Sequence, residues 1–349
     1  MKAVQLVAWH SDPALMEVDV PTAGPGQVVL KVAGAGLCHS DLHLLHDFAD
    51  GMFPWGPPFT LGHENSGWVH QVGAGVEGLS IGQPVAVFGP WGCGHCAACD
   101  RGQDTYCHAP TDSYGSAFGG GLGVDGGQAE FMLVPDARFL VPIPDALDPV
   151  AAAPLTDAGL TPYHAVKMSL PKLMPGSTAL CIGVGGLGHM GVQFIRAMTG
   201  ANIIAMDLKD EALSMATACG ADLTIRGDAE DAVAQVKEAT GGRGADVVID
   251  FVGLDATLAQ AAACAKVQGD MTIVGVGGGS FPMSLFSPPY ECNVRSIYWG
   301  TRSELGEVLT LAAKGLITPE YSTYSLDQAL DAYAAMEAGK LKGRAVIVP

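Results

Sequence analysis

The feature that most constrains the fold is an apolar strand followed by a glycine-rich turn and the start of an amphipathic helix, within residues 178–195. The turn carries the pattern G-x-G-x-x-G between Gly183 and Gly188. Such glycines let the backbone turn tightly and approach a pyrophosphate, whose charge then lies at the positive end of the helix. The pattern recurs at Gly73 and Gly121, but no helix can follow the first and no strand precedes the second.

An acidic residue in the right place strengthens the dinucleotide interpretation. Asp207 ends the next expected strand, about twenty residues after the turn, where a carboxylate binds the adenosine ribose hydroxyls. A carboxylate there repels a 2′-phosphate, so NAD is favoured over NADP, although Lys209 is a neighbouring cation. The alternative is a glycine-rich turn in an ordinary α/β sheet. The expected cofactor-binding residues are Gly183, Gly185, Gly186, Leu187, Gly188, Asp207 and Lys209.

Strands and helices alternate after about residue 150. Strands are expected at 178–182, 202–206, 246–251 and 271–274, each followed by a segment of helical spacing or a glycine-rich turn. This regular alternation predicts an α/β fold with a doubly wound parallel sheet of the Rossmann type.

The remaining chain has a different texture. Short apolar or alternating runs at 28–32, 67–72 and 84–88 are separated by glycine and proline, which predicts a β-rich barrel or sandwich before residue 150. The tail is expected to hold two helices and a final strand, at 304–314, 326–339 and 345–348.

Size and charge exclude some classes of function. A chain of 349 residues favours two domains. Its net charge of -18 repels the phosphates of nucleic acids and of anionic membranes, so neither is an expected partner. The longest uncharged apolar run, 177–195, is interrupted by five glycines and is not expected to span a membrane. No signal-peptide pattern is seen at residues 1–10, so a cytoplasmic protein is expected.

Four cysteines lie close together with two-residue gaps. Such spacing lets one short loop wrap a tetrahedral ion, and four thiolates close its coordination, so a structural zinc is expected. An iron–sulfur cluster and two local disulfides are the alternatives. These four cysteines are Cys93, Cys96, Cys99 and Cys107. The other cysteines are expected to be small buried apolar residues: Cys181, Cys219, Cys264 and Cys292.

A second group of metal-binding residue types lies earlier in the chain. The stretch 36–43 contains Cys38, and the stretch 61–64 ends in His63 and Glu64. A thiolate, an imidazole and a carboxylate form the mixed ligand set that zinc prefers. We therefore expect a catalytic metal at these residues.

With both cysteine-containing patterns and the nucleotide turn in this order, the chain resembles the zinc-dependent medium-chain alcohol dehydrogenases over essentially its full length. Residues 89–93, 155–164 and 298–304 are most similar to the bacterial secondary-alcohol dehydrogenase and aryl-ketone or phenylacetaldehyde reductase branch. The resemblance implies a GroES-like β-rich catalytic domain into which the Rossmann domain is inserted. The implied domains are 1–153 with the zinc lobe 93–107, then 154–298, then a return at 299–349.

The resemblance also implies the metal ligands. Cys38 and His63 bind the catalytic zinc, Asp157 is the remaining ligand, and Glu64 is a nearby or exchanging fourth group. The best-known members have a cysteine where this chain has Asp157. The charge of the site is unchanged by this difference, but an oxygen ligand is harder and leaves the ion a better Lewis acid. The alternative for Asp157 is a helix N-cap.

Further roles come from the same resemblance. Ser40 contacts the substrate oxygen, His43 is the outer end of a proton relay through the cofactor ribose, and His39 faces the pyrophosphate. A histidine in a short helical turn is otherwise surface or pocket lining, which is the alternative for His43. The expected walls of an apolar substrate pocket, for which plain packing is the alternative, are Trp55, Leu122 and Trp299.

The implied activity is reversible hydride transfer between NAD(H) and secondary or aromatic alcohols and their ketones or aldehydes, with two zinc ions per chain. A homotetramer or homodimer is expected. The alternatives are a zinc-free quinone or enoyl reductase of the same fold, a zinc hydrolase, and a nucleotide-sensing protein without turnover. The first of these would lack the zinc patterns, and the second would leave the nucleotide turn without a role.

Overall fold

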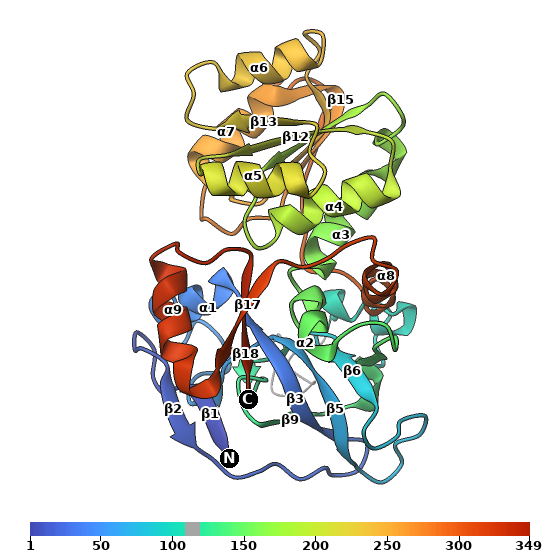
Figure 1. Ribbon diagram of the computed structural model, residues 1–349, viewed down its shortest axis with the longest axis vertical. Helices are drawn as coiled ribbons and strands as arrows, with labels where there is room; N and C mark the ends of the chain where they lie inside the picture. Colours follow the sequence, from blue (N-terminus) through green and yellow to red (C-terminus); the bar gives the residue numbers. More distant parts are fainter. Residues whose placement is uncertain (109–118) are drawn as a thin grey trace. The chain divides into compact units, whose positions relative to one another are not determined.

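The computed structural model describes residues 1–108 and 119–349. They form two compact units, drawn in Figure 1. The first unit comprises Met1–Leu160, Trp299–Gly315 and Pro319–Pro349, and the second comprises Thr161–Tyr298 with Leu316–Thr318. The chain therefore leaves the first unit and later returns to it. The units divide at Leu160, whereas the sequence analysis placed the domain boundary at 153.

The first unit is built on β-sheets. Its larger sheet runs β10-β6-β5-β3-β18-β17, with β9 also paired to β3, and a smaller one runs β2-β1-β4. The C-terminal strand β18 pairs antiparallel with β3, so the end of the chain completes the sheet. The strands are β1 (Lys2–Leu6), β2 (Ala14–Glu17), β3 (Val28–Leu37), β4 (Phe59–Thr60), β5 (Glu64–Val72), β6 (Pro84–Val87), β9 (Phe131–Val134), β10 (Leu140–Pro142), β17 (Tyr321–Ser325) and β18 (Arg344–Val348), with the short pair β7 (Gly119–Gly120) and β8 (Gly123–Val124) apart from them.

Short helices complete the first unit. Helix α8 begins where its sequence T-x-x-E predicts a capping box: the Thr301 backbone N–H donates to Glu304 Oε2 at 2.8 Å, and Glu304 N–H donates to Thr301 Oγ1 at 3.3 Å. The α-helices are α1 (His39–His46), α2 (Pro149–Ala152), α8 (Arg302–Ala313) and α9 (Ala329–Glu337), with 3-10 turns η1 (Cys99–Arg101), η2 (Asp104–Tyr106), η5 (Ala137–Phe139), η6 (Pro154–Thr156) and η8 (Leu326–Gln328).

The second unit contains a six-stranded parallel sheet in the order β13-β12-β11-β14-β15-β16. The order reverses between β11 and β14, and such a switch point is where open α/β sheets bind ligands at the carboxyl ends of their strands. The strands are β11 (Thr178–Ile182), β12 (Asn202–Asp207), β13 (Leu223–Arg226), β14 (Ala245–Asp250), β15 (Ala265–Ile273) and β16 (Asn293–Ser296), and the helices are α3 (Leu160–Ser169), η7 (Leu170–Lys172), α4 (Gly188–Met198), α5 (Asp210–Ala218), α6 (Ala232–Ala239) and α7 (Asp255–Cys264).

Every residue of β11 and β14 is buried. Helices cover both faces of a doubly wound sheet, so its central strands read as continuous apolar runs instead of alternating ones. The core of this unit joins strand and helix residues such as Leu180, Met206, Val248 and Leu258. The predicted fold class, a Rossmann sheet inserted into a GroES-like β-rich domain, is confirmed.

Some details differ from the sequence analysis. The strand expected at 271–274 begins already at Ala265, directly after α7. Its first half was missed because an exposed polar stretch hides the strand pattern in the sequence. The short edge strands β13 and β16 and the polar strand β17 were not anticipated. Cys181 and Cys264 are buried, as expected, whereas the prediction of burial is wrong for the partly exposed Cys219 and Cys292. No described helix is long and apolar enough to cross a membrane.

Candidate functional site

The structure brings four metal-binding side chains of the first unit together. One donor atom from each of Cys38, His63, Glu64 and Asp157 lies within 4.8 Å of the other three. Cys38 lies between β3 and α1, His63 and Glu64 lie at the start of β5, and Asp157 follows η6. Side chains far apart in sequence therefore converge on one buried point.

Strand pairing and one glycine explain this convergence. Gly36 of β3 lies opposite Glu64 of β5 in the antiparallel register. A Cβ atom at Gly36 would lie 2.1 Å from Glu64 Oε2, so only glycine leaves room for the carboxylate. The Gly36-Leu37-Cys38 sequence thus makes space for Glu64 and places the thiol beside it.

Asp41, which the sequence analysis did not select, orients two of these side chains. Its Oδ1 lies 3.1 Å from His63 Nδ1, and its Oδ2 accepts a 3.0 Å hydrogen bond from the Cys38 backbone N–H. His63 Nε2 faces the other way, 3.7 Å from Asp157 Oδ2. A carboxylate on one ring nitrogen is the usual support for a histidine that binds metal through the other.

Arg344 is the second unanticipated residue. This buried first residue of β18 has its Nη2 atom 2.8 Å from Glu64 Oε1, 3.3 Å from Cys38 Sγ and 3.9 Å from Asp157 Oδ2. One guanidinium therefore lies next to three groups that are negatively charged when ionised, and its positive charge can balance them. The signal that would have found it is an arginine directly before the apolar run Ala345–Val348, because a cation buried with such a strand requires an anionic partner.

The charges of the site affect one another. Burial raises the pKa of the Glu64 carboxyl well above its usual range, and Arg344 offsets only part of that rise. Burial also disfavours the Cys38 thiolate, but Arg344 and His63 outweigh it and lower the pKa of the thiol. A thiol made more acidic in this way is a better metal ligand, because thiolates bind metals and thiols do not.

These residues fit a zinc ion. They offer one sulfur, one nitrogen and carboxylate oxygens, which is the mixed donor set of catalytic zinc sites. Among the described residues, Glu64 Oε2 is buried without a hydrogen-bond partner, which a nearby cation would satisfy. The alternative role for Asp157, a helix N-cap, explains less, because its carboxylate reaches the metal cluster.

The four-cysteine lobe forms a second cluster. A tetrahedral zinc with Zn–S bonds of about 2.3 Å needs sulfur atoms about 3.8 Å apart. The Cys96–Cys99, Cys93–Cys99 and Cys96–Cys107 sulfur atoms are separated by 3.6, 3.9 and 4.0 Å, so the lobe fits the ion. A Cβ at Gly92 would lie 2.6 Å from Cys99 Sγ, which explains the glycine there.

Arg138 anchors this lobe to the rest of the unit. Its guanidinium donates to the Gly92 carbonyl, just before the first cysteine, and to the Asp104 carboxylate, between the third and the fourth. Hydrogen bonds from backbone N–H groups lower the pKa of the Cys96 thiol to about 5, and the bond from Cys99 has the largest effect. Burial raises the pKa of the Cys99 thiol to about 12. The lowered pKa of Cys96 favours the thiolate form, which is the form that binds metals.

The expected catalytic residues Ser40 and His43 lie on α1, together with His39, which was expected to bind the cofactor. Ser40 Oγ is 3.6 Å from Cys38 Sγ, so a hydroxyl stands beside the metal cluster. His43 Nδ1 contacts the Asp47 carboxylate one turn further along the helix, and His39 is exposed.

The three expected pocket walls are aromatic or apolar side chains of the first unit. Trp299 packs edge-on against His63, with ring centroids 5.7 Å apart, and its indole N–H donates to Thr156 O at 2.8 Å. Trp55 stacks on Phe53 at 4.7 Å and covers Gly123, the neighbour of the buried Leu122. Trp299 therefore borders the metal cluster, and Trp55 and Leu122 are close to each other.

In the second unit, the glycine turn lies at the switch point. A Cβ at Gly188 would lie 1.8 Å from Gly183 O, so the turn itself requires that glycine. By contrast, nothing lies within 4 Å of a Cβ at Gly185, which leaves its exposed backbone open to a ligand. Gly186 and Leu187 complete the turn before α4 begins at Gly188.

Asp207 ends β12 beside this turn. Its Oδ2 accepts the Val184 backbone N–H at 2.7 Å, and its Oδ1 accepts the Lys209 N–H at 3.0 Å. The carboxylate thus holds the turn in shape while it faces the open end of the sheet. An open glycine backbone, a helix N-terminus and a carboxylate fit the pyrophosphate and ribose of a dinucleotide.

Comparisons with known proteins agree with this class of zinc- and nucleotide-binding oxidoreductase. Residues 24–145 match the family described as alcohol dehydrogenase GroES-like domain, and residues 186–314 match the zinc-binding dehydrogenase family. An alcohol dehydrogenase of Geobacillus stearothermophilus is 35% identical, over 99% of this chain and 98% of that protein. The chain belongs to the zinc-binding alcohol dehydrogenase family.

Solved structures support the same assignment. The alcohol dehydrogenase of Aeropyrum pernix superposes with a TM-score of 0.91 at 37% identity, covering 100% of both chains. The acetophenone reductase of Geotrichum candidum, solved in complex with NAD, superposes with a TM-score of 0.86 at 32% identity, covering 100% of this chain and 97% of the other.

The two clusters predict the metal content. The purified protein is expected to hold two zinc ions per chain, and Cys107→Ser is expected to hold one, because three thiolates no longer close the lobe. Elemental analysis measures both. Cys181→Ser, which changes a buried cysteine outside the clusters, is the control and keeps two. A content of one zinc ion per chain in the wild type would contradict one of the two proposed zinc sites.

Arg344 gives a prediction about stability. Arg344→Leu leaves the neighbouring anions uncompensated and is expected to cost about 3–5 kcal/mol of unfolding free energy in the metal-free protein. Zinc replaces part of the missing positive charge, so added zinc should stabilise the variant more than the wild type. Thermal unfolding with chelator and with zinc measures this. The control is Lys342→Leu, which removes an exposed cation 2.8 Å from Glu320. Equal losses in both variants would contradict the role given to Arg344.

Proposed function

We propose that this protein is an NAD(H)- and zinc-dependent alcohol dehydrogenase, which interconverts alcohols and their ketones or aldehydes by hydride transfer. The observation that carries the proposal is the buried cluster of Cys38, His63, Glu64 and Asp157 in a chain that also has a dinucleotide turn at a sheet switch point. A zinc hydrolase would have no use for the turn, and a zinc-free reductase would have no use for the cluster.

Cys38, His63 and Asp157 hold the catalytic zinc in this proposal, with Glu64 beside it. The bound zinc supplies a Lewis acid that polarises the substrate oxygen. The thiolate and the carboxylate balance the charge of the ion, while Asp41 keeps His63 in the orientation that presents Nε2. Arg344 holds Glu64 by its Oε1 atom, so that this carboxylate stays next to the ligands.

Ser40 and His43 handle the proton. The Ser40 hydroxyl, beside Cys38, both accepts and donates a hydrogen bond, so it passes the proton of the substrate hydroxyl onward. His43 is the outer group of this path, because one imidazole nitrogen can accept a proton while the other donates one. Its contact with Asp47 fixes the ring on α1. His39 faces the cofactor pyrophosphate.

The glycine turn and Asp207 bind the nucleotide in this proposal. NAD supplies the hydride acceptor, and its reduced form the donor. Gly185 and Gly186 let the pyrophosphate approach the backbone, Leu187 and Gly188 lead into α4, and Asp207 receives the ribose hydroxyls. The Asp207 carboxylate repels a 2′-phosphate and so favours NAD over NADP.

The substrates proposed are secondary or aromatic alcohols and their carbonyl counterparts. Trp299 borders His63, and Trp55 with Leu122 adds apolar surface in the same unit. Flat aromatic walls bury an aryl or branched alkyl group of the substrate at small entropic cost. We also place the protein in a reducing compartment such as the cytoplasm, because the lobe needs free thiolates.

An activity assay tests this function. Oxidation of a panel of secondary and benzylic alcohols should produce NADH, measured by absorbance, and a chelator should abolish it. Asp157→Ala is expected to lower turnover at least a thousandfold while binding of NAD, measured by protein fluorescence, stays within about twofold, because the ligand belongs to the metal site alone. The control is Asp12→Ala, a surface change. Full activity in Asp157→Ala would show that Asp157 is a helix cap and not a zinc ligand. If the wild type oxidised no alcohol of the panel, the proposed function would be wrong.

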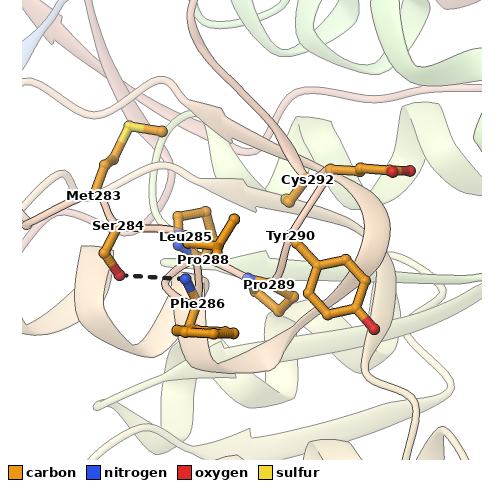
Figure 2. Close-up of a pocket in the computed structure, with 9 residues that line it drawn as sticks. Met283, Ser284, Leu285, Phe286, Pro288, Pro289, Tyr290 and Cys292 are labelled. Atoms are coloured by element: carbon orange, nitrogen blue, oxygen red, sulfur yellow. Dashed lines mark hydrogen bonds between the residues drawn. The ribbon is translucent and has the colours of Figure 1, made fainter.

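We further propose that the protein is a homo-oligomer whose subunits associate through one surface of the second unit. A pocket of about 480 Å³ is lined by nine residues between Met283 and Cys292. Figure 2 shows the side chains of these residues. Four of the lining residues are exposed apolar side chains, Met283, Leu285, Phe286 and Tyr290, with Phe286 at 79%. Val276, a few residues earlier in the chain, is exposed as well. We call these five residues the apolar patch. Residues 271–290 carry no charge, although the chain as a whole is at -18.

The partner that best fits the apolar patch is a second copy of the chain. Within the described residues, β16 follows shortly after the patch and has only β15 as a sheet neighbour, so its other edge exposes backbone donors and acceptors. Two such edges pair with each other around a twofold axis, which gives a self-complementary contact. An uncharged surface is also where two strongly acidic chains repel each other least.

Charge at the apolar patch should dissociate the oligomer. Phe286→Asp is expected to shift the molar mass, measured by light scattering after size exclusion, from a multiple of 35.9 kDa towards one chain. Met174→Asp places the same charge on an exposed apolar residue elsewhere in the second unit and should leave the mass unchanged. A monomeric wild type, or an unchanged Phe286→Asp, would contradict the proposed surface.

A further inference from the structure

Arg226 stands at the edge of the sheet where the nucleotide site opens. It is the last residue of β13 and lies opposite Asp207 in the parallel register of β12 and β13. The following residue, Gly227, donates its N–H to the Asp207 carbonyl oxygen at 3.0 Å. Arg226 therefore belongs to the strand end next to the carboxylate assigned to the adenosine ribose.

The guanidinium of Arg226 is held by two carboxylates. Asp228 binds it at two points, Nε to Oδ1 at 3.0 Å and Nη2 to Oδ2 at 2.8 Å, and Asp210 accepts from Nη1 at 2.9 Å. Gln260 donates to the Gly227 carbonyl at 2.6 Å and so holds the residue between Arg226 and Asp228 in place. A bidentate arginine–carboxylate pair fixes direction as well as charge.

We propose that Asp210 and Asp228 restrain Arg226 and thereby set the preference of this site for NAD over NADP. The inference rests on the proposed function, since it assumes that the glycine turn and Asp207 bind a dinucleotide. An arginine at this strand end is the residue type that binds a 2′-phosphate. Here three of its five N–H groups are already bonded to carboxylates that balance its charge, so it offers little compensation for the negative charge of that phosphate.

The arrangement adds a second element to the discrimination by Asp207. Asp207 repels the 2′-phosphate at the ribose, and the carboxylates of Asp210 and Asp228 neutralise the nearest arginine. Lys209 remains as a cation in the same segment, with its backbone N–H bound to Asp207. Restraint of Arg226 thus keeps one of the two neighbouring cations from binding a 2′-phosphate.

The test is a set of variants of the full chain, with binding of NAD and NADP measured by protein fluorescence and calorimetry. The double variant Asp210→Ala/Asp228→Ala releases Arg226. It is expected to bind NADP roughly ten- to a hundredfold more tightly than the wild type, as one or two charge-assisted hydrogen bonds give. NAD affinity is expected to change by less than about threefold, because the unphosphorylated ribose does not use the released guanidinium.

Two comparisons separate the role of Arg226 from a plain loss of negative charge. Adding Arg226→Gln to the double variant should return NADP affinity to the wild-type value. Asp222→Ala removes a carboxylate from another exposed arginine, 2.6 Å from Arg196 and just before the opposite end of β13, and should leave NADP affinity unchanged. Thermal unfolding checks that all variants fold.

The outcomes are distinct. A gain in NADP affinity that disappears with Arg226→Gln supports the proposal. A gain that persists without the arginine, or no gain at all in a folded double variant, overturns it. If the wild-type chain bound neither NAD nor NADP, the proposed function would fail, and that result differs from both of the others.

Discussion

The buried contact between Arg344 and Glu64, 2.8 Å long, is the interaction on which the first unit depends most. It links β18 to β5, the strand that carries Glu64 of the metal cluster. It also places the Arg344 cation among a thiol and two carboxyl groups that ionise to anions. A buried carboxylate without such a partner is costly, because desolvation disfavours its charge. The C-terminal strand therefore does more than close the sheet: it brings the positive charge that lets a thiol and two carboxylates share a buried site.

Close approach through glycine is the second constraint, and it operates in both units. Gly36 leaves space for the Glu64 carboxylate, Gly92 for Cys99, and Gly188 for the backbone of its own turn. In the nucleotide turn and the first turn of α4, however, the glycines have different surroundings. Phe251 packs where a side chain at Gly191 would lie, whereas Gly185 faces open space. Only the open position is available to a ligand, so the same residue type serves packing at one place and binding at another.

Much of the site could be predicted because its residues carry local signals. The two-residue gaps of the cysteine lobe imply a loop around one ion, and the strand, glycine turn and acid at Asp207 lie within one continuous segment. Asp41 and Arg344 were missed for a physical reason. Neither belongs to a short motif: Asp41 acts on a histidine of another strand, and Arg344 acts across a sheet pairing between β3 and β18. The strands β13 and β16 were missed because edge strands are short and need little apolar sequence.

By itself the sequence determined the alternation of strands and helices, the cysteine lobe and the nucleotide turn, since these follow from hydrophobic period, residue chemistry and spacing. The GroES-like domain and the ligand Asp157 were expected from the family resemblance. Tertiary structure alone decided which groups meet. It placed Asp157 within 3.7 Å of His63, set Arg344 against three acidic groups, and put Arg226 between two carboxylates beside Asp207. Charge interactions fall off with distance and depend on burial, and neither quantity is contained in the order of residues along a chain.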